Sequence, residues 1–454
     1  MNASLSDFTI LEADAAELQQ QLTHGNVTAR EMAALTLAKI ERDNPTLHAF
    51  THVFADQALA SATDSDLRRS RDALRGPLDG VPLAVKANLA VAGWPQHAGL
   101  AFRREAVVSD DAFVIGKLRA AGAVLLGLTN MDAGALGATG RNAAFGDVTN
   151  PRAPGVTTGG SSAGSAAALA AKLTTLAIGT DTIGSVRIPA AYCGIAALKP
   201  TSGAISTRGV IATHQRFDHV GPMARSMRDL ATLFKVLVGW DRQCRVSFPL
   251  TFQPLRPATT PSRVGFVTGF DTLEPDSATL DGYNRAIAAL RAAGHALVPV
   301  DSTQWGLPRV ARAIFALCEI EMARAHASRL EASPGDFSPA LLGLLEFGRR
   351  QRNADMQRFE ARIAALVAST LQAFSQVDYL LAPTTPTTAF LHGSPQVEHS
   401  AAFTCIASAT GRPSVAIPVH SAPDALPASV QLIGQPGDDY NVLSLAQSLE
   451  AAIS

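Results

Sequence analysis

The feature that most constrains the fold of this chain is a repeated order of amphipathic helix, glycine and short apolar run. Residues 111–122 ("DAFVIGKLRAAG") predict a helix stopped by Gly122, and 123–129 ("AVLLGLT") predict a buried strand. The same order recurs at 285–294 ("RAIAALRAAG") and 295–300 ("HALVPV"). Helices that alternate with buried strands indicate an α/β fold.

Five further short apolar runs fit this alternation and are predicted to be strands. They are 175–180, 263–268, 378–383, 414–419 and 429–434, and a helix is expected at 441–453. We therefore expect an α/β fold whose strands are mostly buried.

The N-terminal region has a clear helical pattern. Residues 14–43 are predicted to be helical, with a capping box between Thr28 and Glu31 and an end at Asn44-Pro45. The proline- and arginine-rich stretch 240–262 is expected to be a surface connection.

Composition excludes several classes of function. Lys and Arg total 38 and Asp and Glu total 39, so the net charge of −1 points to neither nucleic acid nor an anionic membrane. Apolar residues form 47% of the chain and charged residues 17%, which favours a large core. The four dispersed cysteines indicate a reducing compartment, and with no basic leader pattern we expect a cytoplasmic protein.

The run "GGSSAGSAAALAA" at 159–171 is unusual, and four interpretations compete for it. A flexible linker fits poorly because strong helix formers follow directly. A phosphate cradle lacks the GK[ST] ending. The stretch 160–164 matches the G-x-S-x-G nucleophile elbow, with His214 or His219 as partners, but no strand precedes it.

The fourth interpretation joins this run to two other segments. One is "GVPLAVKANLAVAGWPQHAG" at 80–99 and the other is "GTDTIGSVRIPA" at 179–190. Together, and in this order, the three resemble the signature of the amidase signature family, whose members are serine hydrolases with a Ser-Ser-Lys triad. Flanking segments on both sides extend the resemblance over nearly the whole chain, apart from about 300–375.

The resemblance implies an organisation along the chain. The N-terminal helical region would span 1–75, the signature core 76–240 and the C-terminal half 241–454, with a helical cover at about 305–375. The implied fold is the amidase signature fold, which is one large α/β domain, here over 1–454, with a mixed, mostly buried central sheet covered by helices on both faces.

The resemblance also implies a role for each member of the triad. Ser185 is the expected nucleophile that forms an acyl-enzyme, and Ser161 is the expected proton relay, preceded by a cis peptide bond after Gly160. Lys86 is the expected base. A base must be uncharged, and the apolar neighbours of Lys86 favour the desolvation that lowers the pKa of a lysine.

Two positions depart from the family pattern. The family often has Asp directly after the lysine, whereas this chain has Ala87, so one negative charge is absent and Lys86 should stay neutral more easily. The family more often has Gly at position 183. Ile183 keeps the backbone donor but adds a branched side chain beside the acyl pocket.

The remaining site residues are assigned by their place in the motif. Backbone N–H groups of Thr182, Ile183, Gly184 and Ser185 are expected to form an oxyanion hole. Asp181 and Arg187 are expected to support the nucleophile turn. Ser162 and Ser165 are expected at a helix N-cap and in packing, and Cys193 in the core.

Substrate contacts are predicted mainly by position. The expected substrate-binding residues are Ala135, Thr158, Gly160 and Phe217. His214, Phe315 and Phe347 lie in segments where the family pattern fades, and they would suit an aryl or aliphatic group.

These observations predict a serine amidohydrolase that cleaves the C–N bond of linear carboxamides. The same route would serve carbamates (a urethanase), ureas or esters. An alternative is an amidotransferase A-type subunit that acts with partner chains, although that subunit typically carries Gln where this chain has Ile188. No cofactor or metal is expected, the partner is a small-molecule amide or carbamate, and the protein is expected to be a monomer or homodimer.

Overall fold

The computed structural model describes residues 7–257, 260–420, 422 and 425–453. It contains one eleven-stranded sheet with the strand order β1-β3-β2-β4-β6-β5-β10-β11-β9-β7-β8. The strands are β1 (Phe50–Val53), β2 (Pro82–Lys86), β3 (Val124–Thr129), β4 (Leu176–Asp181), β5 (Ala196–Lys199), β6 (His219–Ala224), β7 (Arg263–Thr268), β8 (Ala296–Asp301), β9 (Tyr379–Pro383), β10 (Ser414–Val419) and β11 (Ala428–Ile433).

The sheet is mixed, as predicted. Strand β2 pairs in parallel with β3 and β4, and β7 pairs in parallel with β8 and β9. The six strands from β4 to β9 along the sheet are joined by antiparallel pairs. All seven of the predicted strand runs are present, and the central ones are buried on both faces.

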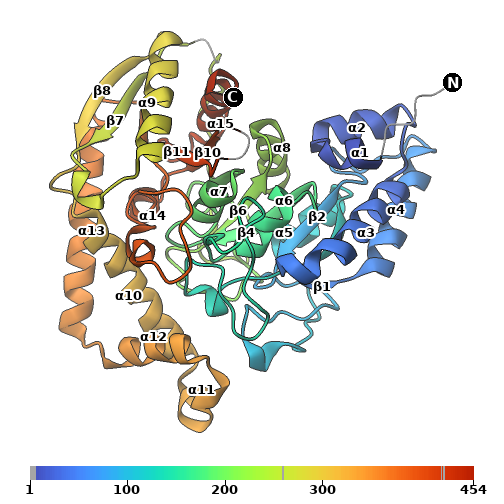
Figure 1. The fold of residues 1–454 in the computed structure, drawn as a ribbon, viewed down its shortest axis with the longest axis horizontal. Coiled ribbons are helices and arrows are strands. Elements are labelled where there is room, and N and C mark those ends of the chain that lie inside the picture. Colours follow the sequence, from blue (N-terminus) through green and yellow to red (C-terminus); the bar gives the residue numbers. More distant parts are fainter. Residues whose placement is uncertain (1–6, 258–259, 421, 423–424, 454) are drawn as a thin grey trace.

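Helices cover both faces of this sheet (Figure 1). Strand β6 contacts α6 and α8, whereas β10 contacts α7 and α15, so each of these strands lies between two helices. The helices are α1 (Asp7–Glu12), α2 (Ala15–Thr23), α3 (Ala29–Leu47), α4 (Ala55–Arg69), α5 (Phe113–Ala120), α6 (Ala163–Ala170), α7 (Arg187–Cys193), α8 (Met227–Leu237), α9 (Ser277–Ala292), α10 (Leu307–Ala325), α11 (Ala327–Ala332), α12 (Pro339–Arg350), α13 (Asn353–Phe374), α14 (Cys405–Thr410) and α15 (Asp439–Ile453).

The N-terminal helix prediction is wrong in two respects. The segment 14–43 is split into α2 and α3 at Gly25, whose φ of +69° lies in the left-handed region. The capping box of Thr28 and Glu31 starts α3 as predicted, but the helix continues past Pro45 to Leu47. The side chain of Asn44 bonds both backbone groups of Phe50 and so fastens this last turn to β1.

The segment 305–375 is helical, as predicted, and forms α10 to α13. These helices lie together at one end of the molecule, drawn in orange in Figure 1. Helix α10 packs mainly against α12, α13 and α14. The segment therefore contributes a wall to the cavity described below.

Candidate active site

The turn between β4 and α7 presents Ser185. Gly184 has a φ of +151°, which favours glycine, and a Cβ at this position would collide with the Thr404 hydroxyl. The Ser185 side chain reaches a cavity and the residue is 9% exposed. The backbone N–H groups of residues 182–185 donate no hydrogen bond to any other residue that the structure describes. The turn thus offers several free donors beside a hydroxyl.

The glycine- and serine-rich run is a tight turn that leads into α6. The peptide bond between Gly160 and Ser161 is cis. The N–H of Ser162 donates to the carbonyl of Ser185 at 3.0 Å, so the run is fastened to the nucleophile turn. Ser161 and Ser185 are therefore brought together from segments that are separate in the sequence.

Ser162 and Ser165 have packing roles. Ser162 occupies the N-cap position of α6, but it caps no helical N–H; its hydroxyl donates to the Thr180 carbonyl at 3.2 Å. The hydroxyl of Ser165 lies 2.7 Å from that of Thr129. The structure places Ser162 at the predicted N-cap position, but its hydroxyl bonds β4 instead of a helical N–H.

Lys86 ends β2, and its side chain contacts Ser161. Its Nζ is 2.8 Å from Ser161 Oγ and 2.9 Å from Thr180 Oγ1, and the residue is fully buried. Burial lowers the pKa of Lys86 to about 7, although the negative charges of Asp132, Asp181 and Asp218 oppose this shift. A substantial fraction of Lys86 is therefore neutral at neutral pH.

Sequence reasoning missed the groups that surround Lys86. Thr180 Oγ1 also accepts a hydrogen bond from Asn88 at 3.0 Å, and this bond holds the Thr180 hydroxyl in place beside the lysine. Asp132 accepts from two backbone N–H groups, and burial raises the pKa of its carboxyl to about 6. Thr180 lies inside the quoted segment 179–190, and Asp132 lies in a flanking segment of the family resemblance. Their place in these segments was the sequence signal that could have pointed to them.

A further group that sequence reasoning missed is Asp218. Its Oδ1 accepts from the Thr182 hydroxyl at 2.7 Å, and its Oδ2 accepts from the backbone N–H of Thr213 at 2.7 Å. Burial raises the pKa of Asp218 to about 6. The carboxylate therefore joins the nucleophile turn to the loop that precedes β6.

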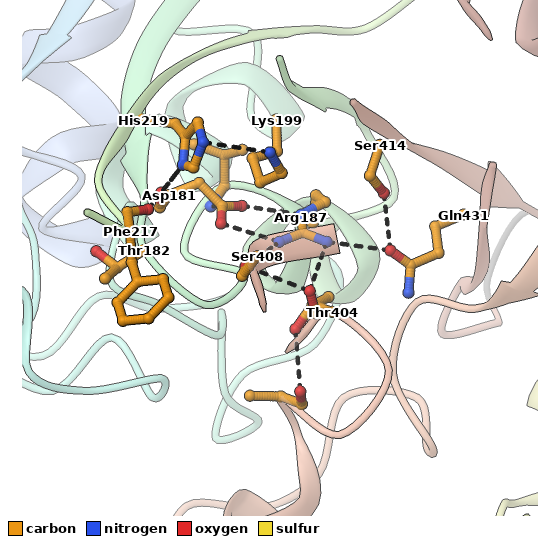
Figure 2. Close-up of polar contacts among 12 residues, drawn as sticks. Asp181, Thr182, Arg187, Lys199, Phe217, His219, Thr404, Ser408, Ser414 and Gln431 are labelled. Carbon is orange, nitrogen blue, oxygen red and sulfur yellow. Dashed lines mark hydrogen bonds and ion pairs between the residues drawn. The ribbon is translucent and has the colours of Figure 1, made fainter. Parts of the chain in front are cut away.

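Asp181 at the end of β4 and Arg187 at the start of α7 pair across the turn that carries Ser185 (Figure 2). Two hydrogen bonds of 3.0 Å join the guanidinium to the carboxylate, and both side chains are fully buried. Arg187 also donates to the Thr404 carbonyl at 2.9 Å and to Gln431 Oε1 at 3.1 Å. Burial alone would raise the pKa of Asp181, but the charge and hydrogen bonds of Arg187, together with the charges of Lys199 and His219, outweigh burial and hold that pKa below its usual value.

The histidines of the nucleophile-elbow interpretation lie elsewhere. His219 Nδ1 lies 2.7 Å from the Phe217 carbonyl, and its Nε2 faces Ser202 and Lys199 (Figure 2). Because a carbonyl only accepts, Nδ1 carries the proton. Neither this ring nor that of His214 contacts Ser162, so the structure does not support that interpretation.

Ser185 opens onto a cavity of about 1200 Å³. Its wall includes apolar side chains from the nucleophile turn, α7, α10 and α12, such as Ile183, Ile188, Phe315 and Leu341. Charged residues line it as well, namely Asp132, Arg141, Asp147, Arg312, Glu319 and Glu398. A cavity of this size takes a molecule larger than a simple primary amide.

Only some of the predicted substrate-binding residues line the cavity. Ala135 and Phe315 line the cavity. Thr158 is fully buried and Gly160 packs against the Asp132 carboxylate, and neither is among the described residues that line it. Phe217 is 1% exposed, so its predicted substrate contact is wrong.

Two more predicted residues lie beside Phe217 or behind the wall. His214 packs on the ring of Phe217, with ring centroids 4.8 Å apart, and does not line the cavity in the described part of the chain. Phe347 lies under the guanidinium of Arg312. Cys193 is buried in the core as expected, and burial raises the pKa of its thiol to about 12.

Within the described ranges, no group of three or more His, Cys, Asp or Glu side chains could hold a metal ion. No helix in the same part of the chain is long and apolar enough to cross a bilayer.

Comparison with known proteins identifies the family. The family model described as Amidase matches residues 31–443, and the chain belongs to this family. A relative from Chloroflexus aurantiacus, the A subunit of glutamyl-tRNA(Gln) amidotransferase, is 35% identical and is covered over 96% of its length by 98% of this chain. The corresponding protein from Streptomyces coelicolor is 32% identical, with the same two coverages.

Solved structures have the same fold. A chain from a vestigial protein complex, described as revealing the evolutionary origins of an s-triazine catabolic enzyme, has a TM-score of 0.90 and 31% identity, with 97% of this chain and 98% of that chain covered. The peptide amidase from Stenotrophomonas maltophilia has a TM-score of 0.85 and 27% identity, with 97% of each chain covered. The 6-aminohexanoate cyclic dimer hydrolase has a TM-score of 0.86 and 26% identity, with 98% and 97% covered.

Proposed function

We propose that this protein hydrolyses the C–N bond of a linear carboxamide through an acyl-enzyme on Ser185. The observation that carries the proposal is the 2.8 Å contact between Lys86 Nζ and Ser161 Oγ behind a hydroxyl that reaches the cavity. A serine needs a base to become a nucleophile, and a buried lysine with a lowered pKa can be that base.

The proposed steps conserve every proton. Neutral Lys86 takes the proton of Ser161 as Ser161 takes that of Ser185, and Ser185 Oγ forms a bond to the substrate carbonyl carbon. The proton then returns through Ser161 to the leaving nitrogen, and the C–N bond breaks to release an amine. Water, activated by the same relay, hydrolyses the ester to a carboxylic acid and free Ser185.

Negative charge develops on the carbonyl oxygen during the attack. The unpaired backbone N–H groups of residues 182–185 are the proposed donors to this oxygen. Removing one such donor in other hydrolases reduces the rate by about 10²–10³. The buried pair of Asp181 and Arg187 would hold the turn in place without contacting substrate.

The chemistry extends to related acyl groups. Carbamates, ureas and esters would form the corresponding acyl-enzyme on Ser185, so a urethanase remains within the proposal. The steps require no metal or cofactor.

A second candidate is an amidotransferase A-type subunit that releases ammonia from an amide and acts with partner chains. The relatives with that name, which match over almost their whole length, favour it. Ile188 favours a free-standing amidase, because it lines the cavity with an apolar side chain where glutamine handling would need polar groups.

Assays of the purified chain test the proposal. Anilides, primary amides, carbamates and esters would be compared with glutamine, with Ser185→Ala as the inactive control. Release of aniline by the isolated chain supports a free-standing amidase. Glutamine hydrolysis that needs added partner chains supports the second candidate, and no Ser185-dependent release from any substrate contradicts both.

A further inference from the structure

We propose that Arg312 and Glu319 form a second binding subsite in the cavity, which recognises a second carboxamide group carried by the acyl part of the substrate. This inference rests on the proposed function, because it names the substrate class of the same site. The substrates would be diamides, in which one amide lies at Ser185 and another lies against α10.

One face of α10 forms a wall of the cavity. The lining residues of this helix recur at helical spacing, and they are Pro308, Ala311, Arg312, Phe315, Cys318 and Glu319. Most of them are apolar or small. Arg312 and Glu319 are therefore the two groups of this face that can fix the orientation of a polar substrate group.

Arg312 is held in place but keeps free donors. Its Nη1 donates to Glu319 Oε2 at 2.8 Å, and the guanidinium carbon lies 4.4 Å from the ring centroid of Phe347. It donates no other hydrogen bond to a residue that the structure describes, and its side chain is 45% exposed. A guanidinium has five N–H donors in a rigid plane, so most of them remain available to a ligand.

Glu319 keeps a free acceptor. The side chain is fully buried, and its Oε1 has no hydrogen-bond partner among the described residues. Burial raises the pKa of this carboxyl above its usual value, and the charge and hydrogen bond of Arg312 offset that shift only in part. A buried carboxylate oxygen without a donor is destabilising. A ligand N–H that reached Oε1 would remove this destabilisation.

A free donor beside a free acceptor matches a carboxamide. The carbonyl oxygen of the amide would accept from Arg312, and its N–H would donate to Glu319. A carboxylate would be attracted by Arg312 but repelled by Glu319. An ammonium group would be attracted by Glu319 but repelled by Arg312. Elsewhere in the wall, Arg141 already pairs with Asp147, and Asp132 already accepts from backbone N–H groups.

Apolar side chains in the cavity wall suit the rest of such a substrate. Ile183, Ile188 and Phe315 line the same cavity. They would contact a hydrocarbon linker that joins the two amide groups.

Monoanilides of straight-chain dicarboxylic acids test the subsite. In a chain-length series, the far end would be a primary carboxamide, a carboxylate, a methyl ester or a methyl group, and aniline release would be measured. At the best length, kcat/KM for the carboxamide should exceed that for the methyl-ended substrate at least about tenfold, with the ester in between. Equal values for carboxamide and methyl ends, or a carboxylate that is best, would overturn the proposal.

Variants test whether the preference for a carboxamide end depends on Arg312 and Glu319. Arg312→Leu should abolish the preference, so that within this variant kcat/KM for the carboxamide falls to the value for the methyl-ended substrate. Glu319→Gln should replace the free acceptor by a donor, so that kcat/KM for the ester-ended substrate equals that for the carboxamide-ended substrate. Arg309→Leu, an exposed position on the same helix that does not line the cavity, is the matched control and should change neither rate.

The design separates the two proposals. If the methyl-ended anilide is hydrolysed in a Ser185-dependent way but no preference depends on Arg312, the subsite is wrong and the proposed function stands. If no anilide is hydrolysed and no primary amide, carbamate or ester is cleaved in a Ser185-dependent way, the proposed function fails with it. Retained hydrolysis of the methyl-ended substrate also shows that each variant is folded.

Discussion

The side-chain nitrogen of Lys86 lies 2.8 Å from the hydroxyl of Ser161, and both residues are fully buried. This contact joins the end of β2 to the turn before α6. The proposed base and the proposed relay are thus shielded by the protein, whereas Ser185 reaches the cavity. Such a division keeps the lysine desolvated, which the proposed chemistry requires.

The first prediction concerns pH. Lys86 must be neutral to accept a proton, and burial lowers its pKa to about 7. Below that pH the ammonium form dominates and cannot act as a base, so kcat/KM should rise with pH through about 7 and level off above it. A pH–rate profile of anilide hydrolysis measures this. A profile without a titration between about pH 6 and 9 would contradict the role of Lys86.

The second prediction uses the departure at position 87. Ala87→Asp would add a negative charge beside Lys86, and a nearby opposite charge stabilises the ammonium form. The midpoint of the pH–rate profile should therefore move up by at least about one pH unit. Ala87→Asn, of equal size but neutral, is the control and should leave the midpoint in place. A shift in both variants would assign the effect to size rather than charge.

The third prediction concerns the buried ion pair. Arg187→Met would leave the carboxylate of Asp181 buried without its partner, which costs about 3–5 kcal/mol of unfolding free energy. Urea unfolding measures this loss. The control is Arg349→Met, which breaks the half-exposed pair with Glu346 and should cost less than about 1 kcal/mol. Equal stability of the two variants would show that the Asp181–Arg187 pair does not support the turn.

The fourth prediction concerns the contact between Thr182 and Asp218. Thr182→Val removes the hydroxyl that bonds the carboxylate but keeps the backbone N–H. If this contact orients the proposed oxyanion hole, kcat should fall by about tenfold or more while KM changes little. The control is Thr232→Val on α8, where the hydroxyl donates only to the Arg228 carbonyl of the same helix. A change in KM alone would assign Thr182 to substrate binding instead.

Much of the fold could be predicted from local pattern. Strands such as β3 and β10 are continuous apolar runs, and Gly122 ends the region of α5 as expected. The N-terminal helices were harder, because their break depends on the left-handed Gly25 and their end on a tertiary contact of Asn44. Periodicity alone reports neither feature.

Residues of the candidate site could be predicted from the sequence only where they lie in a recognised motif. Lys86, Ser161 and Ser185 stand in three quoted segments, and the fold brings these segments together. Phe217 could not be assigned correctly, since an aromatic ring looks the same in sequence whether it faces the core or a cavity. Arg312 and Glu319 lie where no motif was recognised, and only the packing of α10 reveals them.

The central claim is that Lys86 activates Ser185 through Ser161. The most direct test is mass spectrometry of the protein after treatment with a fluorophosphonate probe, which reacts with activated serines. The account predicts one adduct on Ser185, strongly reduced in Lys86→Met and in Ser161→Ala and unchanged in Arg309→Leu. An adduct on another residue, or equal labelling of Ser185 in the Lys86→Met variant, would contradict it.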